Sequence, residues 1–292
     1  MVGWIGCGCV TIGTAVAASL GHLSLALAGI AVLAGAGLAI VVDAWHAARS
    51  MHLRLAQVAR PEALNESLLD ERLGASRAAT IHAVRNALTH QTSEIEALLQ
   101  VLPSMRGEKV LPPSGAFAMD ARALAELTDV VRSCAPRLVV ELGSGTSTVW
   151  VARLLAGTGA RMVSIDHDEH YAQATRRQLH DHGLDDVAHV RVAPLVDRED
   201  GSRWYDLAAI ADLDGIDLLI VDGPPGYIGP YARRPALEEM RPRLSAQPVV
   251  ALDDIVRDEE QQILTEWLER WPEFRRVDAE KSTLAVLRLA QA

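Results

Sequence analysis

The feature that most constrains the fold is an alternation of short apolar segments with longer amphipathic ones from residue 137 onward. Seven segments are strand candidates: 138–142, 162–166, 188–192, 216–222, 248–253, 274–277 and 284–287. Helices are expected between the first six, at about 147–157, 168–182, 204–212, 231–242 and 257–271. Because these apolar runs lack strict alternation, both of their faces should be buried, as in a parallel sheet.

The last two strand candidates are joined by a short turn near Glu280-Lys281-Ser282. Such a turn is too short for a parallel crossover, so these strands should form an antiparallel hairpin. The predicted fold class is therefore α/β: a Rossmann-like, seven-stranded, mostly parallel sheet that ends in an antiparallel hairpin.

The N-terminal segment 1–42 contains no Asp, Glu, Lys or Arg. A helix needs about 20 apolar residues to cross a bilayer, so the segment suits two short spans joined at Gly21–Ser24, or one long span. A cleaved signal peptide is disfavoured, because no basic region precedes the apolar run and a second apolar run follows. Arg49, Arg54 and Arg60 come next, which predicts a cytoplasmic-membrane protein whose C-terminal half faces the cytoplasm.

Residues 43–110 are expected to form a helical linker, with interruptions at Pro61 and Gly74. A seven-residue spacing relates Ile81, Leu88, Ile95 and Leu102. This pattern predicts either a short coiled coil that makes a homodimer through residues 81–102, or an amphipathic strut on the C-terminal domain. The predicted domains are thus 1–42, 43–110 and 111–292.

The charge of the chain argues against a polyanion as partner. The formal net charge is −10, and residues 111–292 hold 20 basic and 30 acidic side chains. Because phosphate contacts need a basic face, a nucleic-acid substrate is not expected. Cys7, Cys9 and Cys134 show no disulfide framework.

A glycine turn follows the first predicted strand, where Leu142 runs into Gly143-Ser144-Gly145-Thr146-Ser147-Thr148. Glycine permits a positive φ and lets a ligand approach the backbone. Asp166 ends the second strand, where a carboxylate can accept hydrogen bonds from both ribose hydroxyls. A dinucleotide site is disfavoured, because Thr148 stands where its third glycine belongs and Glu141 is unusual there.

Glu141-Leu142-Gly143-Ser144-Gly145, together with Asp166, resembles motifs I and II of class I S-adenosylmethionine-dependent methyltransferases. The similarity covers about residues 115–288 and is closest to bacterial members with a Val-Asp-Gly fourth strand, here Val221-Asp222-Gly223. The resemblance implies S-adenosylmethionine as cofactor, with its methionine part in the glycine turn and its ribose on Asp166. The implied cofactor-binding residues are Glu141, Gly143, Ser144, Gly145, Ser147, Asp166 and His167.

Carboxylates also stand at the ends of the fourth and fifth predicted strands. Asp222 is the last residue of the fourth, Asp253 is the last residue of the fifth, and Asp254 comes next. Neighbouring parallel strands would bring all three to one edge, where hard oxygen ligands suit Mg²⁺, Mn²⁺ or Ca²⁺. The arrangement resembles cation-dependent O-methyltransferases of the catechol O-methyltransferase type, and a cation there would lower the pKa of an acceptor hydroxyl. In the alternative, Asp222 only shapes the cofactor pocket and Asp254 caps the helix near Arg257.

Two catalytic residues are predicted. Asp222 should lie near the transferred methyl group, and His167 is the nearest other base, although a histidine beside the ribose acid also suits an adenine pocket or the surface. Trp204-Tyr205 either lines a pocket or packs in the core. Arg233-Arg234-Pro235 either holds an acidic substrate or forms a solvated helix start.

The expected function is a membrane-anchored methyltransferase that moves a methyl group to a hydroxyl of a small molecule, a glycan or a lipid-linked intermediate. Two other functions stay open. One is aminopropyl transfer from the decarboxylated cofactor on a similar fold, and the other is a non-enzymatic membrane scaffold.

Overall fold

The computed structural model describes residues 39, 41–51, 66–104, 109–113, 119–278 and 282–290. The predicted membrane segment 1–42 therefore lies almost entirely outside the described residues. Within the described ranges, no helix is both long enough and apolar enough to span a bilayer. The chain divides into two compact units, with the boundary between Ser93 and Glu94.

The longest helix, α3 (Glu66–Val101), belongs to the predicted linker. It runs through Gly74 without a break, so the predicted interruption there is wrong. A single glycine inside a helix costs only about 1 kcal/mol relative to alanine, which a 36-residue helix can bear. The predicted break at Pro61 lies outside the described residues. The heptad residues Ile81, Leu88 and Leu102 are more than half exposed.

The C-terminal unit starts inside α3, before the predicted boundary at residue 111. Val101 is 2% exposed and belongs to the core of this unit. Glu94 accepts a hydrogen bond from the backbone N–H of Ala121, which begins α4 (Ala121–Cys134), at 2.8 Å. The end of α3 and the 3₁₀ turn η2 (Leu102–Ser104) are therefore part of this unit.

The sheet has seven strands in the order β3-β2-β1-β6-β7-β9-β8. The first five in this order are parallel, whereas β9 is antiparallel to both β7 and β8. The strands are β1 (Leu138–Leu142), β2 (Arg161–Asp166), β3 (Ala188–Val192), β6 (Ile216–Val221), β7 (Leu244–Leu252), β8 (Phe274–Arg276) and β9 (Ala285–Leu289). The predicted mostly parallel sheet with an antiparallel C-terminal hairpin is confirmed.

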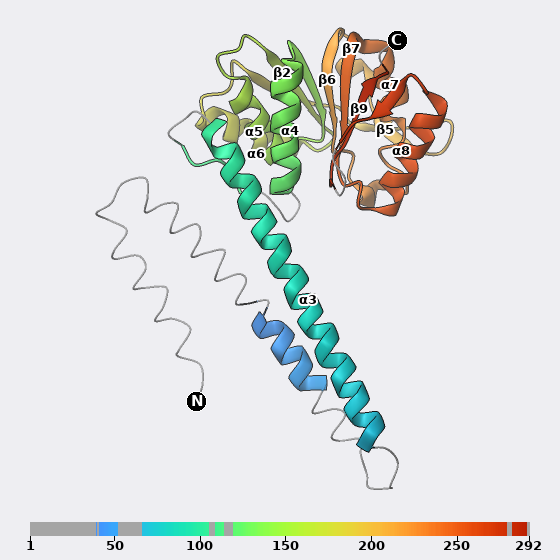
Figure 1. Cartoon of the computed structure of the whole chain (residues 1–292). Helices are drawn as coiled ribbons and strands as arrows, with labels where there is room; N and C mark the ends of the chain where they lie inside the picture. The colour runs from blue at the N-terminus through green and yellow to red at the C-terminus, as the bar shows by residue number, and fades with distance from the viewer. Residues whose placement is uncertain are drawn as a thin grey trace, which may run out of the picture. The chain divides into compact units, whose positions relative to one another are not determined.

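Helices cover both faces of the sheet (Figure 1). Packed on one face are α4, α5 (Thr146–Leu155) and α6 (Glu169–Asp181). The other face carries α7 (Pro235–Met240) and α8 (Asp258–Arg270). Because every central strand is covered on both sides, its apolar residues need not alternate with polar ones.

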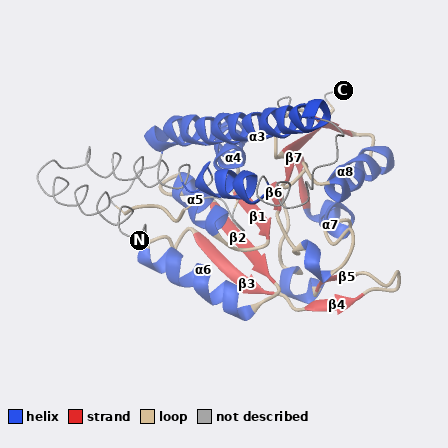
Figure 2. Ribbon diagram, turned by 90° about the horizontal axis from the view of Figure 1, so that it is seen from below, coloured by secondary structure: helices blue, strands red, loops and turns tan. Residues whose placement is uncertain are grey.

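The helix predicted at 204–212 is wrong. This region contains β5 (Arg203–Tyr205), which pairs with β4 (Leu195–Asp197) in a separate hairpin, followed by the 3₁₀ turn η3 (Leu207–Ile210). Figure 2 shows the hairpin apart from the main sheet. Trp204 and Tyr205 are each 1% exposed, so burial of two large aromatic side chains in the core outweighs local helix propensity.

The carboxyl ends of the central parallel strands are aligned. Gly143 N donates to Ile165 O at 2.8 Å, and Asp222 N donates to Leu142 O at 2.9 Å. On the next strand, Asp253 N donates to Val221 O at 3.0 Å. The residues that directly follow β1, β6 and β7 therefore lie side by side along one edge, which is where open α/β sheets bind ligands.

Candidate functional site

The two glycines of the predicted cofactor turn have different surroundings. Gly143 has a φ of +93°, and a Cβ there would lie 2.9 Å from the backbone nitrogen of Gly223. Gly143 is therefore required because the loops after β1 and β6 are packed together. Gly145 has an extended backbone with a φ of 172°, and a Cβ there would meet open space. The open side of the turn is at Gly145.

The carboxylate of Glu141 lies beneath the turn, fully buried. Its Oε1 accepts a hydrogen bond from Ser147 at 2.7 Å, and its Oε2 accepts from Thr148 at 2.5 Å and Ser164 at 2.7 Å. Thr148 Oγ1 also accepts from the backbone N–H of Gly145 at 2.9 Å. Glu141 and Ser147 thus bond to each other and to the turn, and direct contact of either with a cofactor stays a prediction.

Burial raises the pKa of Glu141 to about 7, although the hydroxyls of Thr148, Ser147 and Ser164 oppose this shift. The charge of Asp166 raises it further. Near neutral pH this carboxyl group is therefore divided between its protonated and its ionised form.

Asp166 ends β2 beside the turn and is 4% exposed. Its Oδ2 accepts from both the backbone N–H and the hydroxyl of Ser144, at 3.0 and 2.6 Å. Its Oδ1 accepts from the N–H of Asp168 at 2.9 Å and lies 3.4 Å from Nδ1 of His167. Burial opposes ionisation, but these hydrogen bonds lower the pKa of Asp166 below its usual value. Asp166 is therefore a carboxylate at neutral pH.

A residue that the sequence did not single out lies near this carboxylate. Tyr227 belongs to the 3₁₀ turn η4 (Gly226–Ile228) after β6 and is 75% exposed. Its pKa is raised by desolvation and by its proximity to Tyr171, Asp168 and Asp166. An exposed aromatic ring from the β6 loop thus lies close to the start of α6.

The three predicted metal ligands come together. Asp222, Asp253 and Asp254 each offer an oxygen atom, and these atoms lie within 4.8 Å of one another. Asp253 is 6% exposed, whereas the side chains of Asp222 and Asp254 are 22% and 25% exposed. Asp254 has a φ of +63°, a left-handed conformation that Asp tolerates better than most residues.

Arg233 lies among these carboxylates and is 3% exposed, so the prediction of a solvated helix start is wrong for this residue. Its Nη2 donates to Asp222 Oδ1 at 3.1 Å and to Asp254 Oδ2 at 3.0 Å. The neighbouring Arg234 is on the surface and pairs with Glu266 at 2.8 Å. The two adjacent arginines thus have opposite environments.

Three groups of the cluster, Asp222, Asp253 and Arg233, have shifted pKa values. Burial raises the pKa of Asp222 to about 7, against the opposing effect of Arg233. Burial and the charges of Asp222 and Asp254 raise the pKa of Asp253 well above its usual value. For Arg233, burial disfavours the charge, but the surrounding carboxylates raise its pKa. The guanidinium is therefore charged, and the cluster includes at least one protonated carboxyl group at neutral pH.

A divalent cation does not fit this cluster as it is arranged. Mg²⁺ and Ca²⁺ need oxygen atoms at about 2.0–2.6 Å, and Arg233 Nη2 already lies between the oxygens of Asp222 and Asp254. Asp254 Oδ2 is also paired with Nη1 of Arg257 at 2.9 Å. A dication would thus have to bind beside a buried positive charge.

Tyr205 lies under the same edge of the sheet. Its hydroxyl would be 2.5 Å from a Cβ at Gly223, so it points at the junction of the β1 and β6 loops. The hydroxyl is buried and has no hydrogen-bond partner among the described residues. The alternative in which Trp204 and Tyr205 belong to the core agrees with their burial.

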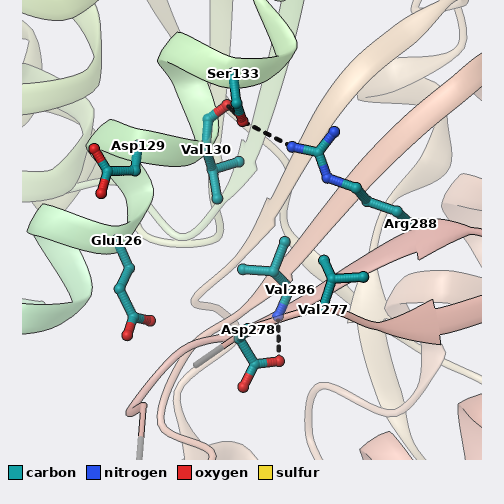
Figure 3. A pocket seen from close by; sticks show the side chains of 8 residues that line it. All are labelled: Glu126, Asp129, Val130, Ser133, Val277, Asp278, Val286 and Arg288. Atoms are coloured by element: carbon teal, nitrogen blue, oxygen red, sulfur yellow. Dashed lines mark hydrogen bonds between the residues drawn. The ribbon is translucent and has the colours of Figure 1, made fainter. Parts of the chain in front are cut away.

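A separate groove of about 390 Å³ is formed by α4 and the end of the sheet (Figure 3). Arg288 of β9 reaches across it to the hydroxyl of Ser133 at 2.8 Å. The eight residues that line the groove are Glu126, Asp129, Val130, Ser133, Val277, Asp278, Val286 and Arg288. None of them belongs to the predicted site.

Comparison with known families bears on the site. Residues 140–255 match a family model described as a methyltransferase domain, and this range includes the glycine turn and all three carboxylates after β6 and β7. The chain carries a methyltransferase domain. The predicted enzyme class is confirmed. A search of curated proteins found no match.

Several solved structures are similar to this chain. A methyltransferase from Geobacter sulfurreducens is 24% identical, with 58% of this chain and 78% of that one covered and a TM-score of 0.45. An O-methyltransferase from Bacillus cereus in complex with SAH is 19% identical, with coverages of 68% and 91% and a TM-score of 0.44. The O-methyltransferase TomG from Streptomyces achromogenes, involved in tomaymycin synthesis and in complex with SAM, is 17% identical, with coverages of 68% and 89% and a TM-score of 0.44.

Proposed function

We propose that this protein transfers a methyl group from S-adenosylmethionine to an oxygen atom of a small-molecule acceptor. The observation that carries the proposal is the position of Asp166 beside the glycine turn, at the carboxyl ends of adjacent strands within the methyltransferase domain. A carboxylate there suits the ribose hydroxyls, and the open side of Gly145 leaves room for the methionine part. O-methyltransferases with SAH or SAM bound are among the similar structures.

Binding of the ribose requires a change at Asp166. Its Oδ2 carries two hydrogen bonds from Ser144, and the hydroxyl bond has to be released to accept from a ribose hydroxyl. The backbone N–H of Ser144 can stay bonded, since a carboxylate oxygen accepts more than one hydrogen bond. The hydroxyl of Ser144 therefore competes with a ribose hydroxyl for Oδ2 of Asp166.

Glu141 supports the turn from below. Through Thr148 it holds the N–H of Gly145, and through Ser147 it holds the start of α5. Glu141 is thus a positioning residue, and Gly145 and Asp166 are the groups that face the cofactor.

The reaction itself needs an acceptor oxygen in line with the methyl group and the sulfonium sulfur. Asp222 is the carboxyl group at the end of β6, next to the turn, and is proposed to orient or deprotonate the acceptor hydroxyl. His167 beside Asp166 is proposed to line the adenosine side of the pocket, with its role as a base left as the alternative.

The experiment uses the full chain, S-adenosylmethionine carrying a tritiated methyl group, and an extract of the source cells. Label is expected in base-stable, water-soluble products of low mass, together with S-adenosylhomocysteine. Label in the lipid or glycan fraction would instead support a lipid-linked or glycan acceptor. Release of methylthioadenosine would indicate aminopropyl transfer, and absence of any transferred label would contradict the proposal.

The N-terminal segment is proposed to anchor the enzyme in the cytoplasmic membrane, with residues 43–110 as a helical linker. The support is the lack of charge in residues 1–42 and the arginines that follow. The full chain should stay with membranes in alkaline carbonate, and a chain starting at residue 43 should be released. Protease added outside sealed, right-side-out vesicles should leave the catalytic domain intact if it faces the cytoplasm.

A homodimer through residues 81–102 is proposed on the basis of the exposed Ile81 and Leu88, which are seven residues apart on α3. Ile81→Glu should convert the dimer to a monomer in light scattering, whereas Glu96→Gln on the same helix should not. A wild-type protein that is monomeric at all concentrations would contradict this proposal.

A further inference from the structure

Arg233 has the most densely bonded buried side chain at the candidate site. It precedes α7 in the chain, and its guanidinium reaches the ends of β6 and β7. Its Nη1 donates to the backbone carbonyl of Asp253 at 3.0 Å, and its Nη2 donates to that of Asp222 at 2.7 Å. The guanidinium thus ties together two strand ends through their backbone.

The same guanidinium also binds the acidic side chains. Nη2 lies 3.1 Å from Asp222 Oδ1 and 3.0 Å from Asp254 Oδ2, so one nitrogen atom joins two of the three carboxylates. A cation held by Asp222, Asp253 and Asp254 would have to lie beside this guanidinium. The position between Asp222 and Asp254 is therefore taken by a nitrogen atom that carries positive charge.

The hydrogen bonds and charges around Arg233 make it hard for a metal ion to replace its guanidinium. A shift of Arg233 away from the cluster would take its two N–H donors from the backbone carbonyls of Asp222 and Asp253. These carbonyls are next to a side chain that is only 3% exposed. Removing the partner of a buried polar group is destabilising, because the group then has neither its hydrogen bond nor water. The second arginine, Arg257, adds positive charge from the solvent side.

We infer that Arg233 takes the place of a divalent cation in this methyltransferase, and that the enzyme works without one. The guanidinium fixes the orientation of Asp222 toward the acceptor, and its positive charge stabilises the ionised carboxylate in the cluster. Arg233 is thus a positioning residue that acts through Asp222. The consequence for turnover rests on the proposed function, whereas the consequence for metal binding does not.

The test is a titration of the full chain with Mn²⁺, in which free and bound ion are separated by electron paramagnetic resonance. The wild-type protein should not bind Mn²⁺ at the acidic cluster. Asp253→Asn should therefore leave Mn²⁺ binding unchanged. Arg233→Ala should open the cluster to one Mn²⁺, with an affinity at least tenfold higher than that of the wild type. Arg234→Ala is the matched control, because it removes an adjacent arginine from the surface, and it should behave like the wild type.

Two outcomes would overturn the inference. One is a wild-type Mn²⁺ site that is lost in Asp253→Asn. The other is a folded Arg233→Ala protein, as judged by circular dichroism, that gains no Mn²⁺ site. If Arg233→Ala does not fold, the Mn²⁺ titration of the wild type and of Asp253→Asn still tests the inference.

Enzyme activity provides a second test, independent of the Mn²⁺ titration. Methyl transfer by the wild type should be unchanged within twofold after treatment with EDTA, and loss of activity that Mg²⁺ restores would contradict the inference. Absence of methyl transfer under all conditions would count against the proposed function alone, because the Mn²⁺ titration does not depend on turnover.

Discussion

Replacement of Glu141 by glutamine should change how the stability of the protein depends on pH. The folded carboxyl has a pKa of about 7 because it is buried, whereas its ordinary value is 4.5. Its contribution to stability is therefore fully present below pH 4.5 and is lost as the pH rises toward and through 7. The difference between the two pKa values corresponds to roughly 3 kcal/mol, at about 1.4 kcal/mol for each tenfold change.

Glutamine fits the same hydrogen bonds. Its oxygen can accept from Thr148 and Ser164 as Oε2 of Glu141 does, and its amide can donate to Ser147, whose hydroxyl rotates to accept. Glu141→Gln should therefore match the wild type at pH 5 and exceed it at pH 8.5, by an amount on the order of 2–3 kcal/mol.

The assay is urea unfolding of the full chain, followed by tryptophan fluorescence between pH 5 and 8.5 in the same buffer and detergent for each variant. The control is Glu269→Gln, which changes an exposed glutamate on α8 and should follow the wild-type curve. A wild-type minus Glu141→Gln difference that stays constant across this range would refute the reasoning, because it would mean that Glu141 does not titrate there.

Three further substitutions test the turn. Gly143→Ala should destabilise the protein by at least about 1–3 kcal/mol in the same assay, because of its positive φ and the contact with Gly223. Gly145→Ala should leave stability within about 0.5 kcal/mol of the wild type but weaken cofactor binding in calorimetry by roughly 1–3 kcal/mol, because its Cβ fills the open side. Ser144→Ala should strengthen cofactor binding up to about fivefold, since a hydrogen bond worth roughly 1 kcal/mol to Asp166 no longer has to be broken. Equal effects of the two glycine substitutions, or weaker binding by Ser144→Ala, would contradict these assignments.

The sheet could be predicted from the sequence because each strand carries its own local signal. Buried parallel strands need continuous apolar runs, and the segments around Val139, Ile165 and Ile220 show them plainly. The short strand β5 gives no such signal. Whether Trp204 belongs to a helix or a strand depends on the core that surrounds it, which is formed by residues far apart in the chain.

In the candidate site, too, some residues could be predicted from the sequence and others could not. Asp166, Asp222 and Asp253 could be found because each is the last residue of a predicted strand. The role of Arg233 could not be found, because Arg233 and Arg234 have the same side chain and adjacent positions in the sequence. Only the packing of the loop against β6 and β7 turns one of them inward and leaves the other in solvent.

The most direct test of the account is calorimetric titration of the full chain with S-adenosylmethionine. One molecule should bind per chain, and Asp166→Asn should weaken binding by roughly 10–100-fold, which corresponds to about 1.5–3 kcal/mol for hydrogen bonds to a charged group. Asp185→Asn, at an exposed carboxylate elsewhere, should leave binding unchanged. Absence of binding, or binding that Asp166→Asn does not alter, would contradict the central claim that this carboxylate and the turn beside it hold the methyl donor.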